Sequence, residues 1–442
     1  MEVYRTDGVR CFAARSWGVA WPMTLIMFFE FIIGLTDVYV AGRVSKDVQA
    51  AYGFVIQFYF MFIVIANALT VGTVSVVSRL YTTGDGDAVS TAISSSLAAT
   101  FASGLVVSVS GILFAPQLIE LLNIPSQLKP YSIPLIEIYS AGLLFAYTVI
   151  NCNGILRSSN MIKASLKTMT VVCIANVILT LFLVFYTPLG FRGIALATAA
   201  STLIGSIINI SYVRRVMTRI GPLSWKTIVR IASIGWPMGA LQVLWQLGSL
   251  AIFLIISELP HNRIEILAAL TAGLRIESAI YLPAFAFNMA NAVIIGNLLG
   301  EKRHDEAYRS GLITALIGVG VVTVLIFIVV LNAWWITSLL SDNPLVVKET
   351  VRYIYISMIS EPFMAWGIIL GGGMSGAGDT RSVLVRVALS IWLIRIPLAY
   401  ILVVILGFGA ASVWWSMNIS QFVQAFLLYR RYSKRQWLAV SA

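Results

Sequence analysis

The chain has 442 residues, of which 59% are hydrophobic and only 11% are charged. Soluble domains carry about 25% charged residues, so this composition excludes an ordinary soluble protein. The formal net charge is +11, from 30 Lys and Arg against 19 Asp and Glu. Three cysteines without metal-ligand or disulfide spacing, together with only two histidines, leave little for a metal site or for an enzyme's catalysis.

Apolar stretches recur along nearly the whole chain, and each is long enough to cross the roughly 30 Å hydrocarbon core of a bilayer. Strand-like alternation of apolar and polar residues is absent, so the stretches predict helices and not a β-barrel. We therefore expect an all-α polytopic membrane protein with about twelve transmembrane helices. The predicted spans lie near residues 17–41, 51–80, 90–115, 133–153, 163–187, 193–213, 229–257, 266–298, 311–333, 352–374, 383–405 and 408–429.

The basic residues gather on one side of the predicted bundle. With the N-terminus placed inside, about 21 Lys and Arg fall on the cytoplasmic side and about 7 outside. The dense clusters are Arg157/Lys163/Lys167, Arg214/Arg215/Arg219/Lys226/Arg230 and Arg430/Arg431/Lys434/Arg435. This distribution predicts that both termini are cytoplasmic, and it explains the positive charge by topology, without nucleic-acid binding.

Two acidic residues interrupt the first apolar stretch. Glu30 and Asp37 are seven positions apart, two helical turns, so both carboxyls project from the same face. A carboxylate in hydrocarbon costs at least about 2.5 kcal/mol, so it is rarely kept there without a function. The pair predicts a water-filled cavity that handles cations or protons. The two residues are about 10 Å apart along the helix axis, too far for shared coordination of one ion.

The two halves of the chain resemble each other, with matched positions about 215 to 224 residues apart. The matched segments are 15–23 with 230–238, 67–72 with 291–296, 154–160 with 373–379, and 190–201 with 407–420. Each half holds six predicted spans, so the repeats enter the membrane from the same side and are parallel. We expect an N-lobe at residues 1–220 and a C-lobe at 221–442. Gly221-Pro222 breaks any continuous helix between them.

Short motifs distributed over essentially the whole chain carry a family resemblance. They are Asp37 with Gly42, Gly154 to Arg157, Gly190 to Thr198, Ala268-Ala269 with Arg275 to Glu277, Gly296 to Gly300, and Gly376 to Thr380. Together they resemble the multidrug and toxic compound extrusion (MATE) transporters of the multidrug/oligosaccharidyl-lipid/polysaccharide exporter superfamily.

This resemblance implies a secondary antiporter that exports amphiphilic, cationic organic compounds by alternating access. The coupling ion would be H⁺ or Na⁺, and no bound cofactor is expected. The resemblance further implies a monomer surrounded by membrane lipids in a prokaryotic cytoplasmic (inner) membrane.

The resemblance also implies a cation or proton site in the N-lobe, closest to the DinF-like branch of the family. Asp37, Asn176 and Thr198 match the family's first-helix acid, fifth-helix amide and sixth-helix hydroxyl. Thr180 stands where those relatives carry a second acid. Asp37 would be the metal ligand if the ion is sodium. A lone carboxyl suits proton exchange at least as well, because a proton removes its buried charge. Glu30 is a candidate for a relay through water.

A secondary acidic site is expected to involve other helices. The NorM-like branch places an acid in the seventh helix, where this chain has Trp245-Gln246. Glu361 in the tenth predicted helix and Glu137 in the fourth are the candidates for such a site.

Three further charged residues fall inside predicted spans: Arg275, Glu277 and Arg395. We expect structural roles for all three, with Arg395 either neutralising a C-lobe acid or reaching toward the membrane surface. The first alternative function is a lipid-linked oligosaccharide or lipid flippase of the same superfamily, whose cavity would be lined by cations. A non-transporting membrane scaffold is the second alternative, and the buried carboxyls and the two-lobed repeat oppose it.

Overall fold

The computed structural model describes residues 8–121, 124–259 and 261–439. In these residues every regular element is a helix. The first half forms α1 (Val9–Val44), α2 (Lys46–Tyr81), α3 (Gly86–Leu113), α4 (Ala115–Leu121), α5 (Lys129–Ser158), α6 (Ile162–Phe185) and α7 (Arg192–Val216). The second half forms α8 (Trp225–Ser257), α9 (Arg263–Gly300), α10 (His304–Leu331), α11 (Ala333–Ser338), α12 (Pro344–Ser357), α13 (Glu361–Gly376), α14 (Thr380–Leu389), α15 (Ile396–Tyr400) and α16 (Ala410–Ser433). Two π-helical segments, η1 (Ser390–Arg395) and η2 (Ile401–Ile405), and the 3₁₀-helix η3 (Gln436–Ala439) complete the chain.

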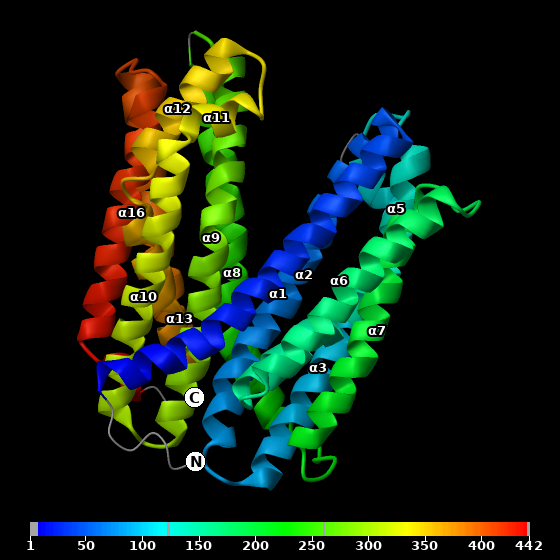
Figure 1. The fold of residues 1–442 in the computed structure, drawn as a ribbon, viewed down its shortest axis with the longest axis vertical. Helices are drawn as coiled ribbons and strands as arrows, with labels where there is room; N and C mark the ends of the chain where they lie inside the picture. Colours follow the sequence, from blue (N-terminus) through cyan, green and yellow to red (C-terminus); the bar gives the residue numbers. More distant parts are fainter. Residues whose placement is uncertain (1–7, 122–123, 260, 440–442) are drawn as a thin grey trace. The chain divides into compact units, whose positions relative to one another are not determined.

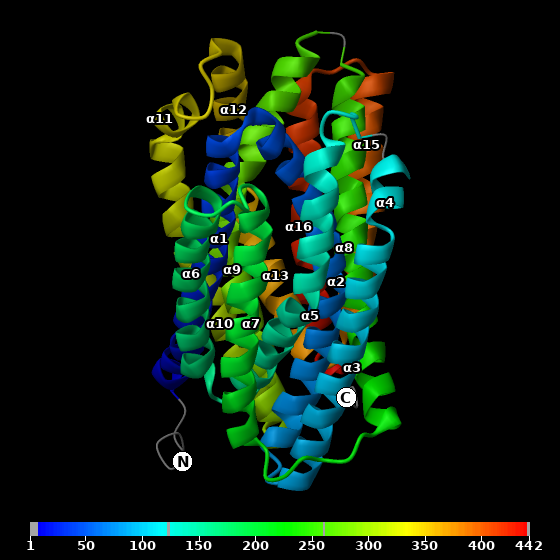
Figure 2. The same ribbon diagram turned by 90° about the vertical axis from the view of Figure 1, so that its right-hand side faces the viewer.

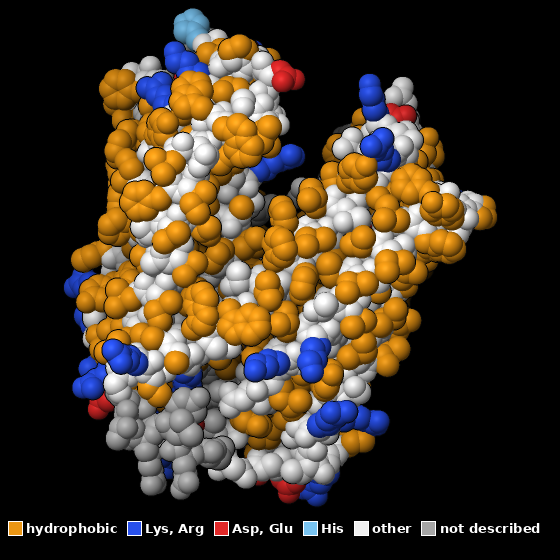
Figure 3. All heavy atoms as spheres, viewed as in Figure 1, with side chains coloured by type: hydrophobic (Ala, Val, Ile, Leu, Met, Phe, Trp, Pro, Cys, Tyr) orange, Lys and Arg blue, Asp and Glu red, His pale blue; other side chains and the backbone are white. Residues whose placement is uncertain are grey.

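Most of these helices are long and apolar enough to cross a membrane. Within the described residues, ten pass this test alone, and the pair α12 and α13, bent by 56°, makes an eleventh. The helix α16 has 24 residues but a polar face that includes the buried Asn418, Gln421 and Gln424. On the face shown in Figure 3, hydrophobic side chains cover the sides of the helices, and charged side chains lie mostly toward the ends. The predicted polytopic all-α class is confirmed.

The chain forms two compact units. The N-unit is Pro22–Gly239, and the C-unit comprises the described residues of Met1–Trp21 and Ala240–Ala442. In the N-unit, α5 packs against α2, α3 and α7, and α6 packs against α7. In the C-unit, α9 packs against α10, α12 and α13, and α13 packs against α16 (Figures 1 and 2). Each unit has its own apolar core, which contains Tyr52 and Leu135 in the N-unit and Tyr353 and Trp414 in the C-unit.

The helix α1 changes unit part-way along its length. Its first segment, up to Trp21, belongs to the C-unit. There the hydroxyl groups of Ser16 and Thr314 on α10 share a hydrogen bond of 2.6 Å. The ring of Trp17 lies 6.2 Å from that of Phe287 on α9. The segment from Pro22 onward, which carries Glu30 and Asp37, belongs to the N-unit.

The helix α8 makes the corresponding change in the opposite direction. Its first segment, up to Gly239, belongs to the N-unit. A Cβ atom at Gly72 on α2 would come within 2.0 Å of the Ile231 carbonyl oxygen, so this approach requires glycine. The changes of unit fall beside Pro22 in α1 and close to Pro237 in α8. Each proline removes a backbone hydrogen bond at that point, where the helix can bend.

The expected lobes, residues 1–220 and 221–442, follow the sequence repeat and remain the prediction for how the repeat divides. The compact units differ from that division because the starts of α1 and α8 are exchanged. A boundary drawn from sequence similarity cannot predict this exchange, because the exchange depends on which helix surfaces pack together.

The backbone repeats the turns of one half in the other. Asn160, in the turn between α5 and α6, has a left-handed backbone conformation with φ 57°. Gly378, in the matched turn between α13 and α14, is also left-handed, with φ 91°. Another pair, Gly190 with φ 54° and Gly407 with φ 68°, precedes α7 and α16. Such conformations are costly for most residues, so their recurrence at matched positions supports the internal repeat independently of residue identity.

The segment between α7 and α8 is held along α3 by side-chain hydroxyls. The amide of Thr218 donates to Ser90 Oγ at 3.1 Å, and that of Gly221 donates to Ser94 Oγ at 3.1 Å. A Cβ atom at Gly221 would lie 2.4 Å from the Thr91 nitrogen, so glycine is required there. The helix break predicted at Gly221-Pro222 is therefore present, in a segment packed against its own unit.

Candidate functional site

Three helices of the N-unit place polar side chains around Asp37. Asp37 lies in the last third of α1 and is only 2% exposed. Asn176 and Thr180 are four residues apart on α6, so they share a face, and both are buried. Thr198 follows the first turn of α7 and is half-buried. The structure thus brings together the four residues predicted for the N-lobe site.

The carboxylate of Asp37 accepts hydrogen bonds from two hydroxyl groups. Thr180 Oγ1 donates to Oδ1 at 3.3 Å, and Thr198 Oγ1 lies 3.2 Å from Oδ2. Asn176 Nδ2 donates to Thr198 Oγ1 at 3.1 Å, which leaves the Thr198 hydrogen available for Asp37. The second predicted acid of the family site is therefore replaced here by a hydroxyl donor, and the site carries one formal charge.

Two polar atoms near Asp37 make no hydrogen bond of good geometry among the described residues. One is the carbonyl oxygen Oδ1 of Asn176, and the other is the phenol oxygen of Tyr139 on α5. Both residues are buried, and Tyr139 lies close enough to Asp37 and Thr198 to interact electrostatically with them. Buried acceptors without partners are uncommon. They can receive a hydrogen bond from a protonated carboxyl, or they can serve as oxygen ligands to a cation.

Aromatic side chains form the wall next to this site. The ring of Tyr139 lies 5.2 Å from that of Tyr59 and 6.4 Å from that of Tyr52, both on α2. A cavity of about 10 Å³ lies between α2 and α5, with Tyr59, Tyr139 and Ser140 in its lining. This volume is at the lower limit for one water molecule.

Glu30 lies apart from the Asp37 hydrogen bonds. Its side chain is exposed, in contrast to that of Asp37. Arg157, half-buried near the end of α5, is close enough to interact electrostatically with it, and so is the phenol of Tyr59. Tyr59 also interacts electrostatically with Asp37, so it is near both acids. The separation predicted from helix geometry agrees with this arrangement, and a relay role for Glu30 stays a prediction.

A second buried acidic cluster lies in the C-unit. Glu277 on α9 and Glu361 at the start of α13 are each 1% exposed. The phenol oxygen of Tyr281 lies 3.1 Å from Glu277 Oε2 and 3.2 Å from Glu361 Oε1. Tyr353 on α12 donates to Glu277 Oε1 at 2.7 Å. Glu361 was the sequence candidate for a secondary site, whereas Glu277 was expected only to tie helices together.

The buried guanidinium of Arg395 belongs to this cluster. Arg395 ends the π-helical segment η1, is 7% exposed, and donates from Nε to Ser420 Oγ at 2.8 Å. It interacts electrostatically with both Glu277 and Glu361. Of the two alternatives left open for this residue, proximity to C-lobe acids is the one seen. Arg275, two residues before Glu277, is exposed, as expected for residues on different faces of α9.

The remaining predicted acid, Glu137, takes no part in either cluster. It is half-buried on α5, two residues from Tyr139 and so on a different face. Among the described residues, no group of three or more His, Cys, Asp and Glu is arranged to hold a metal ion.

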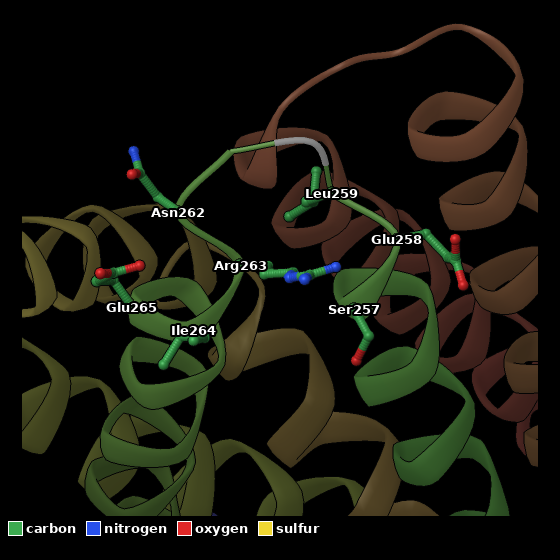
Figure 4. Close-up of a pocket in the computed structure, with 7 residues that line it drawn as sticks. All are labelled: Ser257, Glu258, Leu259, Asn262, Arg263, Ile264 and Glu265. Atoms are coloured by element: carbon green, nitrogen blue, oxygen red, sulfur yellow. The ribbon is translucent and has the colours of Figure 1, made fainter.

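A pocket of about 520 Å³ lies between the end of α8 and the start of α9 (Figure 4). Arg263 extends there toward the end of α8, whereas Glu265 points away from it. This pocket is formed by loop and helix-end residues and contains none of the predicted site residues.

The tyrosines of both clusters were missed by sequence reasoning. A signal existed for Tyr281, which is four residues after Glu277 and therefore on the same helical face. No local signal existed for Tyr353, which is 76 residues from Glu277, or for Tyr139, which is on a different helix from Asp37.

The two halves of the chain match one family model. Residues 22–182 and 237–401 match the MatE model, one segment in each repeat. The chain belongs to the MatE family. The resemblance to MATE transporters noted from short motifs is thereby confirmed.

Individual MatE relatives are similar over nearly their full length. The chain is 22% identical over 433 residues to the uncharacterized transporter YisQ of Bacillus subtilis, covering 95% of this chain and 94% of YisQ. It is 24% identical over 434 residues to a protein named probable multidrug resistance protein NorM from Bradyrhizobium diazoefficiens, covering 94% and 91% of the two chains. The fold is similar to the outward-facing conformation of a multidrug resistance MATE family transporter, with a TM-score of 0.89, 18% identity and 97% coverage of both chains.

Membership of the MatE family defines the class of activity. The chain is a multi-pass membrane transporter and not an enzyme. MatE transporters are ion-coupled and need no cofactor. The flippase alternative is not favoured, because the named relatives are multidrug resistance proteins.

Proposed function

We propose that this transporter exports amphiphilic, cationic small molecules in exchange for protons, with Asp37 as the coupling group. The observation that carries the proposal is the environment of Asp37. It is a single carboxyl buried in a membrane-spanning helix and contacted by hydroxyl donors, and no second buried acid accompanies it among the described residues of the N-unit. Such a group is stable as a neutral acid or as an anion with a bound cation, and exchange between the two is what antiport requires.

The two hydroxyl donors around Asp37 support a proton over a metal ion as the exchanged species. A protonated Asp37 has an additional hydrogen to donate, and the phenol oxygen of the buried Tyr139 is close enough to accept it. Thr180 Oγ1 and Thr198 Oγ1 lie within hydrogen-bond distance of the carboxylate and can donate to it, an arrangement suited to an anion and opposed to a cation in the same place. Sodium is the alternative ion, and it would require both hydroxyl groups to rotate and Asn176 to turn its Oδ1 toward Asp37.

Exposed groups on α1 support a cationic, amphiphilic substrate. Glu30 is exposed on α1, and the aromatic ring of Tyr59 on α2 is close enough to interact electrostatically with it. A carboxyl and aromatic faces are the features that recognise organic cations, through charge and through cation–π attraction. The multidrug names of the MatE relatives agree with a broad range of such compounds.

Alternating access would follow from the neutralisation of Asp37. We expect protonation to change the packing of α1 between Pro22 and Asp37, because a neutral carboxyl no longer needs both hydroxyl donors. The helix can bend at Pro22, where a backbone hydrogen bond is missing. The orientation with both termini in the cytoplasm, the location in a prokaryotic cytoplasmic membrane and the monomeric state belong to the same proposal.

The test uses purified full-length protein in liposomes with an imposed proton or sodium gradient. Ethidium flux would be followed for wild type, for Asp37→Asn and for Glu137→Gln, which removes an acid outside both clusters. Proton-driven flux that disappears in Asp37→Asn and persists in Glu137→Gln supports the proposal. Sodium-driven flux with the same dependence on Asp37 would assign the other ion. Flux that survives Asp37→Asn would overturn the role of this residue.

A further inference from the structure

The segment between α7 and α8 has a bonded face and an exposed face. On the bonded face, every third residue donates its backbone amide to a serine hydroxyl of α3 at 2.9 to 3.1 Å, and these residues are Thr218, Gly221 and Ser224. The neighbouring residues are exposed. Three of them are large and apolar, with exposed fractions of 80% for Ile220, 67% for Leu223 and 75% for Trp225. The hydrogen bonds to α3 therefore hold an apolar face outward.

This apolar face lies at the ends of the spans. The segment follows the end of α7 at Val216, reaches α8 at its first residue, Trp225, and lies beside the first three turns of α3 (Figure 2). Arg219 pairs there with Asp87 at 2.9 Å, and the two side chains are 63% and 62% exposed. A charged pair that solvent reaches belongs at the surface of a membrane and not in hydrocarbon. Lipid tails account for exposed apolar side chains along a span, but these residues need another explanation.

The corresponding segment of the C-unit shows that the fold does not require such a face. Residues after α16 return to the start of α10, as those after α7 return to the start of α3. Arg435 pairs with Asp305 at 2.8 Å, and Asp305 is the second residue of α10, as Asp87 is of α3. There, however, Trp437 is fully buried and its ring stacks on that of Tyr432 at 4.7 Å. The two repeats share the return of the chain and the ion pair, but the N-unit exposes its tryptophan.

Cationic side chains surround the apolar face. Five exposed ones lie in the segment or in the helix turns that flank it: Arg214, Arg215, Arg219, Lys226 and Arg230. Of the two acids at the start of α3, Asp87 pairs with Arg219, and Asp85 accepts hydrogen bonds as the N-cap of the helix. Arg79, near the end of α2, is close enough to Arg230 for the two like charges to repel each other. An anion held at this face would relieve the excess of positive charge.

A membrane surface with anionic headgroups satisfies both properties of the face. Tryptophan and aliphatic side chains are favourable at the boundary between headgroups and acyl chains, and nearby Lys and Arg are attracted to anionic lipids. Free phosphate would neutralise the cations but leave the apolar side chains in water. An acidic protein would have to displace lipid, since the ends of two spans already bring the face to the membrane boundary.

We propose that residues 217–226 are a docking surface for anionic phospholipids, with Ile220, Leu223 and Trp225 inserted among the headgroups and the flanking cations bound to phosphate. Because α8 starts on this segment, the contact would fix the start of that helix at the membrane boundary. The assignment to the cytoplasmic leaflet rests on the proposed orientation of the chain, whereas the preference for an anionic surface does not.

The first test measures where the apolar face lies. A spin label is attached through Leu223→Cys in full-length protein that also carries Cys11→Ser, since the other two cysteines are buried. In nanodiscs of phosphatidylcholine and phosphatidylglycerol, we expect the label to be relaxed by oxygen, which concentrates in the membrane, and to be protected from a water-soluble nickel chelate. Thr83→Cys is the matched control, because this exposed residue lies in the α2–α3 turn of the same unit, and nickel should reach it. Equal nickel access at both positions would overturn the proposal.

The second test measures the preference for headgroup charge. Spin-labelled phosphatidylglycerol and phosphatidylcholine are compared for the fraction that the protein immobilises in nanodiscs. Lys226→Gln/Arg230→Gln should lower the preference for phosphatidylglycerol by about threefold or more, since one cation near an anionic surface changes binding roughly fivefold. Lys163→Gln/Lys167→Gln removes two exposed cations from the start of α6 and should leave the preference unchanged. Equal losses in the two variants would attribute the preference to overall charge and would contradict the proposal.

A third measurement separates a lipid surface from other occupants. In nanodiscs of phosphatidylcholine alone, inclusion of phosphatidylglycerol should lower nickel access to the label at position 223 by about twofold or more, whereas added inorganic phosphate should not. Equal protection by free phosphate would indicate a site for soluble anions and would overturn the proposal. None of these measurements involves flux or an ion gradient, so their outcome is distinguishable from failure of the exchange proposed at Asp37.

Discussion

The Asp37 site and the Glu277–Glu361 cluster lie in the two repeats of one fold, and their buried carboxyls are surrounded by different groups. Among the described residues of the N-unit, Asp37 is the one buried charged side chain, and its hydrogen-bond partners are neutral. The C-unit places a guanidinium near its acids. Neutral donors stabilise an anion but leave its charge in place, whereas a fixed cation cancels it.

The difference suggests a division of roles between the repeats. A carboxyl without an internal counter-ion exchanges ions with the solution, because only a mobile ion can neutralise it. In the C-unit, Arg395 interacts electrostatically with Glu277 and Glu361 and supplies a positive charge that is part of the chain. Repeats that share turns and helix order therefore need not share a coupling mechanism, since a few side chains decide the charge balance.

The largest effect is expected from removal of the N-unit charge. Asp37→Asn should reduce gradient-driven ethidium flux by more than about tenfold, to the level of protein-free liposomes, because no exchangeable charge remains. Glu361→Gln should lower flux less, since Asp37 stays intact. Equal losses in the two variants would show that both repeats couple transport, and the reverse order would place the main coupling site in the C-unit.

The next effect concerns the hydroxyl groups around Asp37. Thr198→Val removes a donor to Asp37 and an acceptor for Asn176, whereas Thr180→Val removes only a donor. A hydrogen bond to a charged group contributes about 1.5–3 kcal/mol. We expect Thr198→Val to shift the pH dependence of flux more than Thr180→Val does. Identical profiles for the two variants would mean that the Asn176–Thr198 contact is not part of the site.

A smaller effect separates the phenols of the two clusters. Tyr281→Phe should lower stability by about 1–3 kcal/mol, because two buried carboxyl oxygens lose a partner. Tyr139→Phe should be nearly neutral for stability, since its hydroxyl has no hydrogen bond of good geometry among the described residues. Chemical denaturation in detergent measures both. A larger loss for Tyr139→Phe would indicate that its hydroxyl holds the anionic form of Asp37.

The smallest effect is expected at Glu30. Glu30 takes no part in the hydrogen bonds of Asp37 and has Arg157 nearby, so Glu30→Gln removes a charge that the Asp37 site does not use directly. Flux should fall by no more than about threefold, and the unfolding midpoint should not change. A loss as large as that of Asp37→Asn would make Glu30 a coupling group in its own right. Flux measured against ethidium concentration shows whether the change lies in substrate affinity or in turnover.

Much of the fold could be predicted from the sequence, and the same holds for part of each site. Apolar length predicted the spans, because hydrocarbon accepts only segments with internally bonded backbones. Asp37, Asn176, Thr180 and Thr198 were named in advance from matched motifs, and the structure places them together. Asp379 shows the limit of local reasoning: it stands at the N-cap position of α14 but makes no capping hydrogen bond with its side chain, and its carboxylate pairs with Arg431 on α16.

By itself, the sequence determined the class of protein, the internal repeat and the intramembrane positions of the acids, because hydropathy and repeat offset are properties of the chain alone. Only the tertiary structure decided which side chains meet. The first segments of α1 and α8 are exchanged between the compact units. Tyr353 donates a hydrogen bond to Glu277, which is 76 residues away in the sequence. Arg395 interacts electrostatically with two acids on other helices. Such contacts depend on how helices pack, and neither residue type nor local spacing contains that information.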